Sequence, residues 1–425
     1  MNPPLIYNLF QRLVGPTTKW GEHARRAKEM GFNWLYINPW HYPGFSGSLY
    51  APKELRRLNP LYLPAGADPE SLEPLKAFLW EMKELGMPVL MDLVINHTSK
   101  DSPLTREHPD WYVRDSNGQV VSPSVTDPDD PTKVTVWGDL AEIDNAHSPD
   151  RQKLWGFWVS LVRDSMELGF DGFRCDAAYM VPAELWRLLI EEARALNPRA
   201  LFMAETLGAR VEAVLALKEA GFHYFFNSSK WWDFREPWAL EQHEKFGAVA
   251  PSISFPETHD TPRLAGETNG DEAIQKQRYA FAAAFSAGLM MPLGYEFGFR
   301  RQVNVVETMP SHWERKSFDL RPFITRVNRL KLESRALQTE GHLATPRGLV
   351  TDVLVLERRV DDSPPAYILV NTDPNLPRGV DLNDLEDPGG LRLHRVCRED
   401  RAAEGEPVPP KLALDGAEVA YLLPS

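Results

Sequence analysis

The feature that most constrains the fold is an eightfold alternation of short apolar segments with longer segments of helical period. The apolar segments are rich in β-branched and aromatic residues, and they lie at residues 5–10, 33–38, 88–96, 169–177, 201–206, 223–227, 252–260 and 290–298. Strands separated by helices pair in parallel, because each connection must cross over the sheet. Eight such units predict a closed (β/α)8 barrel of the α/β class.

The helical segments between these strands carry their own start and stop signals. Trp20, Ala24 and Ala27 fall on one face of a helix that starts near residue 18, and Gly31 is suited to end it. A further helix is expected to begin at Ser148 and Pro149, which favour the first positions of a helix. The remaining clear helices are predicted at residues 72–85, 183–196, 272–287 and 319–335.

Two segments depart from the alternation and define the predicted domains. Residues 98–137 are rich in Asp, Pro, Ser and Thr and are too long for an ordinary loop, which predicts an inserted subdomain B after the third strand. Residues 339–425 change to short alternating pieces punctuated by Pro, Gly and Asp, which predict a C-terminal antiparallel β-sandwich. The barrel itself is therefore assigned to residues 1–97 and 138–338.

Charge and cysteine content restrict the partners and the compartment. The formal net charge of −13 disfavours nucleic acid as a partner, because such binders need an excess of Lys and Arg on one face. Cys175 and Cys397 are too few for a disulfide framework, and the N-terminus lacks the pattern of a signal peptide. No apolar run of membrane-spanning length occurs. We expect a cytoplasmic protein with an uncharged ligand and no membrane partner.

Acids and histidines follow four of the predicted strands. They are Asp92 and His97 after the third, Asp176 after the fourth, Glu205 after the fifth, and His259 with Asp260 after the seventh. The loops at the carboxyl ends of the strands build the pocket of a (β/α)8 barrel. We therefore expect these side chains to meet in one site.

A pair of carboxyl groups at such a site can break a glycosidic bond with retention, one as nucleophile and the other as proton donor. Because side chains alternate along a strand, Arg174 and Asp176 project to the same side, and the guanidinium favours ionised Asp176. Asp176 is the predicted nucleophile and Glu205 the proton donor. Asp260 is the predicted third carboxylate, and Glu257 is the alternative acid beside it.

These segments resemble the short sequence regions of the alpha-amylase family of retaining glycoside hydrolases and transglycosylases. The family spacing of Asp, four residues and His matches Asp92 and His97, and Arg, any residue, Asp matches Arg174 and Asp176. Residues 138–145 and 48–60 resemble two further family regions. The resemblance implies action on alpha-1,4-glucosidic bonds of maltooligosaccharides or alpha-glucans, with no required cofactor.

The resemblance also implies residues outside the triad of Asp176, Glu205 and Asp260. Tyr50 matches a sugar-stacking tyrosine, and Asn96 with Asp139 match calcium-ligand positions, so that calcium is possible. The other residues implied in substrate binding are Asp92, His97, Arg174 and His259. Asp92 is equally suited to fix Arg174 by a charge pair, and the aromatic segment 222–238 either offers stacking platforms or packs internally.

One departure from the family pattern bears on the reaction. Where many alpha-amylases have Lys and His, three and four residues after the nucleophile, this chain has Tyr179 and Met180. This change makes transfer to a sugar acceptor, as in a maltosyltransferase-like branch, an alternative to hydrolysis. A sucrose- or trehalose-specific enzyme would share the same triad, and an inactive sugar-binding barrel is the hypothesis without catalysis. Chain-length preference, endo or exo action and oligomeric state are left open.

Overall fold

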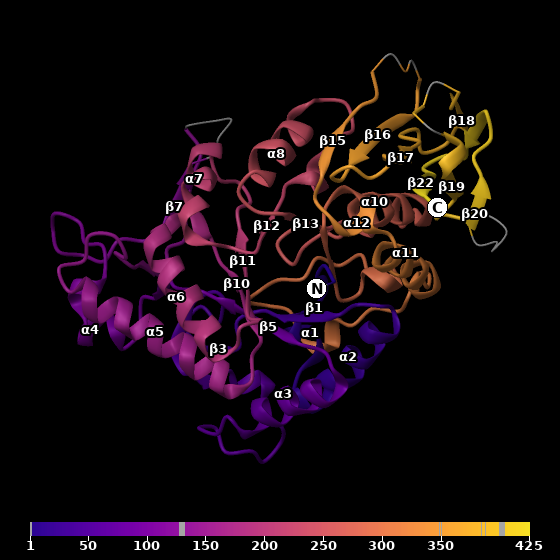
Figure 1. The fold of residues 1–425 in the computed structure, drawn as a ribbon. Helices are drawn as coiled ribbons and strands as arrows, with labels where there is room; N and C mark the ends of the chain where they lie inside the picture. The colour runs from indigo at the N-terminus through magenta and orange to yellow at the C-terminus, as the bar shows by residue number, and fades with distance from the viewer. Residues whose placement is uncertain are drawn as a thin grey trace.

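The computed structural model describes residues 2–126, 132–347, 349, 351–383, 385–386, 388–398 and 404–425. Its central feature is a closed barrel of parallel strands, in the order β1-β14-β13-β12-β11-β10-β5-β2 (Figure 1). The barrel strands are β1 (Leu5–Leu9), β2 (Trp34–Ile37), β5 (Val89–Leu93), β10 (Gly172–Cys175), β11 (Leu201–Glu205), β12 (Tyr224–Phe226), β13 (Ser252–Ser254) and β14 (Gly288–Pro292). The predicted (β/α)8 barrel is confirmed.

Helices connect the strands and pack around the outside of the barrel (Figure 1). The longer ones are α2 (Trp20–Glu29), α3 (Glu73–Leu85), α5 (Arg151–Leu168), α6 (Ala183–Leu196), α8 (Trp238–Gly247), α10 (Glu272–Phe285) and α11 (Arg321–Glu333). The short ones are α1 (Gln11–Val14), α4 (Leu104–Glu107), α7 (Val211–Leu215), α9 (Leu264–Glu267) and α12 (Arg335–Gln338). Gly86 ends α3 in the left-handed region, with φ of 64°, as a glycine can do without steric cost.

Three boundaries differ from the sequence predictions for local reasons. Helix α5 begins at Arg151 rather than at Ser148, whose hydroxyl accepts a hydrogen bond from the Asp150 amide in the turn before the helix. Strand β13 ends at Ser254, so that the residues up to Asp260 form a loop, and Pro256 has no amide hydrogen for a ladder. Strand β14 ends at Pro292 and is followed by a short 3-10 helix.

The barrel interior is filled by side chains from alternating positions on its strands. This interior cluster consists of Ile6, Trp34, Tyr36, Leu90, Leu201, Met203, Phe226, Ile253, Phe255 and Met290. A Cβ at Gly172 would lie 2.3 Å from the carbonyl oxygen of Leu201, so that only glycine fits at this interior position. A separate, larger apolar cluster joins the strands to the surrounding helices. The interior is therefore filled, and the active site of such a barrel is expected at the carboxyl ends of its strands.

The chain leaves the barrel twice between β2 and α5. The first excursion is an antiparallel hairpin of β3 (His41–Pro43) and β4 (Pro52–Leu58), which the sequence analysis did not predict. The second contains the predicted subdomain B, with β6 (His97–Ser99) paired to β9 (Leu140–Glu142) and β7 (Ser124–Thr126) paired to β8 (Val134–Val136). Residues 127–131 of that subdomain lie outside the described residues. The domain boundaries given above stay predictions.

The C-terminal region is antiparallel, as expected. A six-stranded sheet has the order β15-β16-β17-β22-β19-β20, and β18 pairs with β21. The strands are β15 (His342–Ala344), β16 (Leu354–Arg359), β17 (Ala366–Val370), β18 (Arg378–Asp381), β19 (Leu391–His394), β20 (Glu404–Pro407), β21 (Lys411–Leu414) and β22 (Val419–Pro424). The sheet packs beside α10, where the Tyr421 hydroxyl donates to the Ala280 carbonyl at 2.6 Å (Figure 1).

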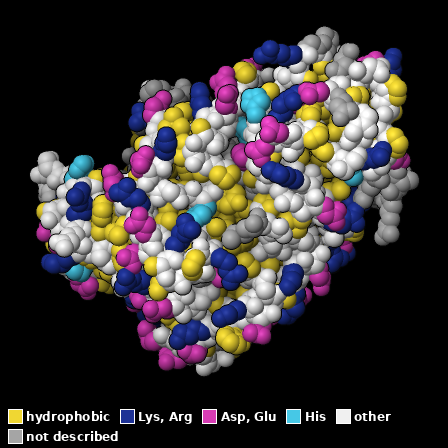
Figure 2. All heavy atoms as spheres, viewed as in Figure 1, with side chains coloured by type: hydrophobic (Ala, Val, Ile, Leu, Met, Phe, Trp, Pro, Cys, Tyr) yellow, Lys and Arg dark blue, Asp and Glu magenta, His cyan; other side chains and the backbone are white. Residues whose placement is uncertain are grey.

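The exposed surface shows no gathering of basic side chains on the face drawn in Figure 2, where Lys and Arg are interspersed with Asp and Glu. None of the helices in the described part of the chain is long and apolar enough to cross a membrane.

Candidate active site

Adjacent strand ends bring Asp92 and Arg174 together inside the top of the barrel. The two residues are register partners on β5 and β10, and Arg174 Nη1 donates to Asp92 Oδ1 at 2.9 Å. The Asp92 side chain is fully buried. Its burial raises the pKa of Asp92, while the charge of Arg174 and hydrogen bonds from two tyrosines oppose that rise. The charge pair that the sequence analysis considered for Asp92 is therefore present.

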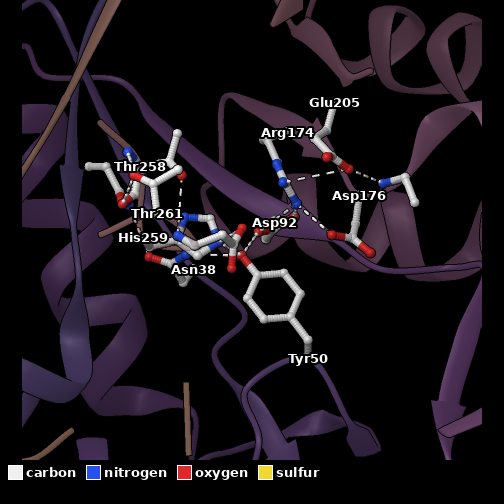
Figure 3. Close-up of polar contacts among 12 residues, drawn as sticks. Asn38, Tyr50, Asp92, Arg174, Asp176, Glu205, Thr258, His259 and Thr261 are labelled. Atoms are coloured by element: carbon white, nitrogen blue, oxygen red, sulfur yellow. Dashed lines mark hydrogen bonds and ion pairs between the residues drawn. The ribbon is translucent and has the colours of Figure 1, made fainter. Parts of the chain in front are cut away.

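The same guanidinium reaches both predicted catalytic carboxyl groups (Figure 3). Arg174 Nη1 donates to Asp176 Oδ1 at 2.6 Å, and Nη2 lies 3.7 Å from Glu205 Oε2. Both carboxylates remain partly accessible, with 13% of the Asp176 side chain and 15% of the Glu205 side chain exposed. Asp176 and Glu205 thus share the positive charge of Arg174, which lies closer to Asp176 than to Glu205.

The backbone after Asp176 supplies a second contact to Glu205. Ala177 has φ of 39°, in the left-handed region that non-glycine residues adopt rarely and at some cost. Its amide donates to Glu205 Oε2 at 2.7 Å (Figure 3). The turn therefore links the end of β10 to the carboxyl group at the end of β11.

Burial dominates the ionisation of Glu205. Burial is the largest cause of the rise and the charge of Asp176 adds to it, whereas Arg174 and the Ala177 amide oppose it, and together they bring the pKa of Glu205 to about 7. A carboxyl group with a pKa near neutrality is able to hold a proton and release it at physiological pH. Glu205 thus has the ionisation that a proton donor needs.

Tyr50 and His259 form the opposite side of the site. The Tyr50 hydroxyl donates to Asp92 Oδ2 at 2.5 Å and lies 2.7 Å from His259 Nε2, with the two rings parallel at a centroid distance of 5.4 Å (Figure 3). His97 Nε2 contacts the Tyr50 carbonyl at 2.7 Å. His259 therefore meets the hydroxyl end of the Tyr50 ring, and this hydroxyl is held within the polar network.

Asp260 lies at the open edge of the same network. His259 Nε2 is 3.0 Å from Asp260 Oδ2, and 60% of the Asp260 side chain is exposed. Desolvation would raise the pKa of Asp260, but the neighbouring charge and hydrogen bond of His259 hold it below its ordinary value. Asp260 therefore presents an ionised oxygen to the site.

Glu257, the alternative acid, is not available to this site. It is fully buried with Arg263, whose Nη1 donates to Glu257 Oε1 at 2.6 Å, and its other oxygen accepts from the Leu264 amide at 2.7 Å. It is absent from the described residues that line the cavity. The pair instead fixes the start of α9.

Several residues of the network were not identified from the sequence. The Tyr36 hydroxyl donates to Asp92 Oδ2 at 2.5 Å, and Asn38 Nδ2 donates to the Tyr50 hydroxyl at 2.9 Å. In the loop after β13, the amide of Asp260 donates to the Thr258 hydroxyl at 3.2 Å. Tyr36 follows Trp34 at the interior spacing of β2, and this alternation is the signal that could have identified it.

A cavity of about 470 Å³ joins the predicted residues. Its lining includes Tyr50, Asn96, His97, Asp139, Arg174, Asp176, Glu205 and Asp260, together with Trp137, Tyr179, Met180 and Leu207. Asp92 and His259 lie behind this lining, in contact with Tyr50. A larger cavity of about 630 Å³ lies at the opposite end of the barrel, beside Lys83, Asp171 and Arg199, and none of the predicted site residues lines it.

The two predicted calcium ligands fit that ion only in part. Asn96 and Asp139 both line the cavity, and the buried Asn96 Oδ1 has no hydrogen-bond partner in the described structure. However, the Asn96 amide nitrogen contacts the sulfur of Met180 at 3.9 Å, and sulfur is a poor ligand for a hard cation. Among the described residues, no group of three or more His, Cys, Asp or Glu side chains is placed to hold a metal. Calcium stays a prediction of the sequence.

Comparisons with known proteins agree with the barrel fold. Residues 4–118 match the family model of the glycogen debranching enzyme glucanotransferase domain. The alpha-1,4-glucan:maltose-1-phosphate maltosyltransferase of Burkholderia pseudomallei is 27% identical over 397 residues, which cover 87% of this chain and 33% of that protein. The enzyme of the same name from Salinibacter ruber is 24% identical and covers 83% of this chain and 56% of its own length. The chain thus spans about a third to just over half of these relatives.

Solved structures give a match over nearly the whole chain. An alpha-amylase from Lactobacillus plantarum superposes with a TM-score of 0.74 at 23% identity and covers 98% of both chains. An alpha-glucosyl transfer enzyme, XgtA, superposes with a TM-score of 0.76 at 15% identity and covers 100% of both chains. At these identities the superpositions establish the shared fold.

Proposed function

We propose that this chain, which is related to the alpha-amylase family and to its maltosyltransferase-like branch, is a retaining enzyme that acts on alpha-1,4-glucosidic bonds of maltooligosaccharides or alpha-glucans. The observation that carries the proposal is the pair Asp176 and Glu205 at neighbouring strand ends, both in contact with Arg174, in a cavity of about 470 Å³. This arrangement has the two carboxyl groups that retention requires.

In the first proposed step, an Asp176 carboxylate oxygen attacks the anomeric carbon of the donor sugar. The bond from that carbon to the glycosidic oxygen breaks, and Glu205 gives its proton to the departing oxygen. A pKa of about 7 keeps enough Glu205 protonated near neutral pH for this role. Asp260, with its ionised oxygen, would hold ring hydroxyls and favour the positive charge that develops at the anomeric carbon.

In the second step, the hydroxyl of water or of an acceptor sugar attacks the same carbon. Glu205, now ionised, takes the hydroxyl proton, the bond to Asp176 breaks, and the free carboxylate is restored with the original configuration at the sugar. Water gives hydrolysis and a sugar hydroxyl gives transfer. Transfer is the alternative function. It is supported by the similarity of this chain to two maltosyltransferases and to the transfer enzyme XgtA.

Arg174, Tyr50, His97 and His259 would orient the two carboxyl groups and the bound sugar. The Tyr50 hydroxyl reaches both Asp92 and His259, so its proposed role is to position this network and to present a ring edge to the sugar. His259 meets the hydroxyl end of the ring at 2.7 Å and does not lie over its face. The stacking role that the resemblance implied for Tyr50 stays a prediction.

A time course of products from maltopentaose, alone and with added maltose, tests the function. Hydrolysis yields only shorter sugars, whereas transfer yields some that are longer than maltopentaose. Absence of any bond breakage, with Asp176→Ala as the inactive control, would contradict the proposal.

A further inference from the structure

We infer that the leaving-group side of this cavity selects an uncharged sugar and disfavours a donor that carries a phosphate at its anomeric carbon. The inference rests on the proposed function, since it concerns the same cavity and the same pair of carboxyl groups. It bears on the choice between a neutral glucan and a sugar phosphate such as maltose 1-phosphate.

The position of Glu205 identifies the leaving-group side, because a proton donor must lie next to the departing oxygen. The Ala177 amide contacts Glu205, and Leu207 and Gly208 follow it along the chain and line the cavity. Tyr179 also belongs to this side, because it lies in the turn directly after Ala177 and lines the cavity. Met180 ends the same turn and also lines the cavity.

The described residues of this side offer no unpaired cation to a phosphate. Among the described lining residues, Arg174 is the only Lys or Arg. Its Nη1 already donates to Asp92 and Asp176, and its Nη2 is paired with Glu205. Among the described lining residues His97 is the one histidine, and burial lowers its pKa, which favours the neutral imidazole. A phosphate would therefore have to displace a carboxylate to gain a cation.

The remaining charges around the cavity repel an anion. Asp139, Asp176 and Asp260 line it with Glu205, so the surroundings stay net negative even when Glu205 is protonated. Arg210 and Lys133 are exposed and are not among the described lining residues. Since like charges in a partly desolvated site are costly, a doubly charged phosphate is disfavoured here.

The uncharged part of the wall suits a sugar. Tyr179, Leu207 and Met180 offer apolar contact to the carbon-bound hydrogens of a pyranose face, and Trp137, which is 41% exposed, lines the same cavity. Aromatic side chains with a polar atom can both stack and donate a hydrogen bond. A neutral glucosyl leaving group therefore gains contacts where a phosphate gains none.

The test compares three maltosyl donors with maltose as acceptor: maltopentaose, p-nitrophenyl alpha-maltoside and maltose 1-phosphate. We expect kcat/KM for maltose 1-phosphate to be at least about 100-fold below that for the aryl maltoside, because its leaving group meets the carboxylates. Turnover of maltose 1-phosphate within about tenfold of the aryl donor, or above it, would overturn the inference and leave the proposed function intact. Arg210→Ala and Lys133→Ala would then identify the cation.

Loss of the proposed function gives a different result, since none of the donors would react. Calorimetric binding of maltose and of maltose 1-phosphate then decides the inference separately: weaker binding of the phosphate supports it, and tighter binding contradicts it.

A charge variant supplies the positive control. Met180→Lys places an ammonium on the leaving-group side, and we expect it to raise the ratio of kcat/KM for maltose 1-phosphate to that for the aryl maltoside by about tenfold. The matched variant Met180→Leu keeps the wall apolar and is expected to leave the ratio unchanged. An equal rise in both variants would show that the size of Met180, and not the missing charge, limits phosphate use.

Discussion

Replacing Glu205 with Gln tests the proton-donor role, because burial gives this carboxyl group a pKa of about 7. At pH 7 about half of the enzyme then carries the proton, whereas a glutamate at its ordinary pKa of 4.5 would be only about 0.3% protonated. The environment therefore raises the fraction of competent enzyme about 150-fold. We expect wild-type kcat/KM to fall above pH 7 by about tenfold for each further pH unit.

The variant should lose this alkaline limb and most of its activity on maltopentaose. With alpha-maltosyl fluoride, whose leaving group needs no proton, formation of the glycosyl-enzyme should survive the replacement far better. Rapid-quench measurement of that first step with both donors, between pH 5 and 9, separates the two expectations. If the step slows equally with both donors, Glu205 is not the general acid.

The same pKa predicts a change in stability. Between pH 4.5 and 7 the folded protein keeps a proton on Glu205 that the unfolded chain has lost, so wild-type stability falls as the pH rises through this window. The difference between the two pKa values corresponds to about 3 kcal/mol at pH 8.

Glu205→Gln carries no titrating group at this position, so its stability should not fall in this way. The free energy of unfolding in urea of the variant, relative to that of wild type, should therefore increase by about 3 kcal/mol between pH 4.5 and 8. The exposed Glu244→Gln is the matched control and should show no comparable gain. A pH-independent difference between Glu205→Gln and wild type would contradict the burial argument.

Four further outcomes are expected. Asp176→Ala and Asp260→Asn should fold, as circular dichroism can check, yet lose maltopentaose cleavage by orders of magnitude, because each removes one member of a catalytic unit. Arg174→Met leaves the buried Asp92 without its cation and should lower the free energy of unfolding by about 3–5 kcal/mol, and adding Asp92→Asn should restore part of that loss. If calcium binds at Asn96, EDTA should lower the thermal midpoint and added calcium should restore it, whereas an unchanged midpoint, or an equal drop in Asn96→Ala, would contradict that site. A crystal structure should place the Asp176 and Glu205 carboxyl groups about 5–5.5 Å apart, and a separation near 9 Å would contradict retention.

The sequence predicts most of what lies at the strand ends. The alternation of side chains along a strand predicts that Arg174 and Asp92 both project into the barrel. Because β5 and β10 are neighbouring strands of the closed sheet, the two side chains are also expected to form a charge pair. The location of Glu205 beside Asp176 follows in the same way from β11. These residues are predictable because regular strands place side chains at fixed intervals.

Loop geometry was less predictable, since it depends on contacts between distant segments. The hairpin of β3 and β4 brings Tyr50 to Asp92 and His259, and neither contact has a local sequence signal. Glu257 was the alternative catalytic acid in the sequence analysis. Its pairing with Arg263 could not be predicted, because it depends on how the loop after β13 packs against the start of α9. The positive φ of Ala177 was likewise not expected, because alanine has no preference for the left-handed region.

The Arg174 guanidinium makes unequal contacts with three carboxyl groups, and this difference explains how similar groups can have different roles. Arg174 Nη1 contacts both Asp92 and Asp176 closely, and two tyrosine hydroxyls complete the shell of Asp92. Glu205 receives only the longer 3.7 Å contact and one backbone amide, so these favourable contacts do not offset its burial. It therefore holds its proton near neutral pH, while Asp176 has the shorter contact with the cation. Moving the guanidinium nearer Glu205 would lower the pKa of the donor and weaken the contact that supports the nucleophile, so both roles depend on this one position.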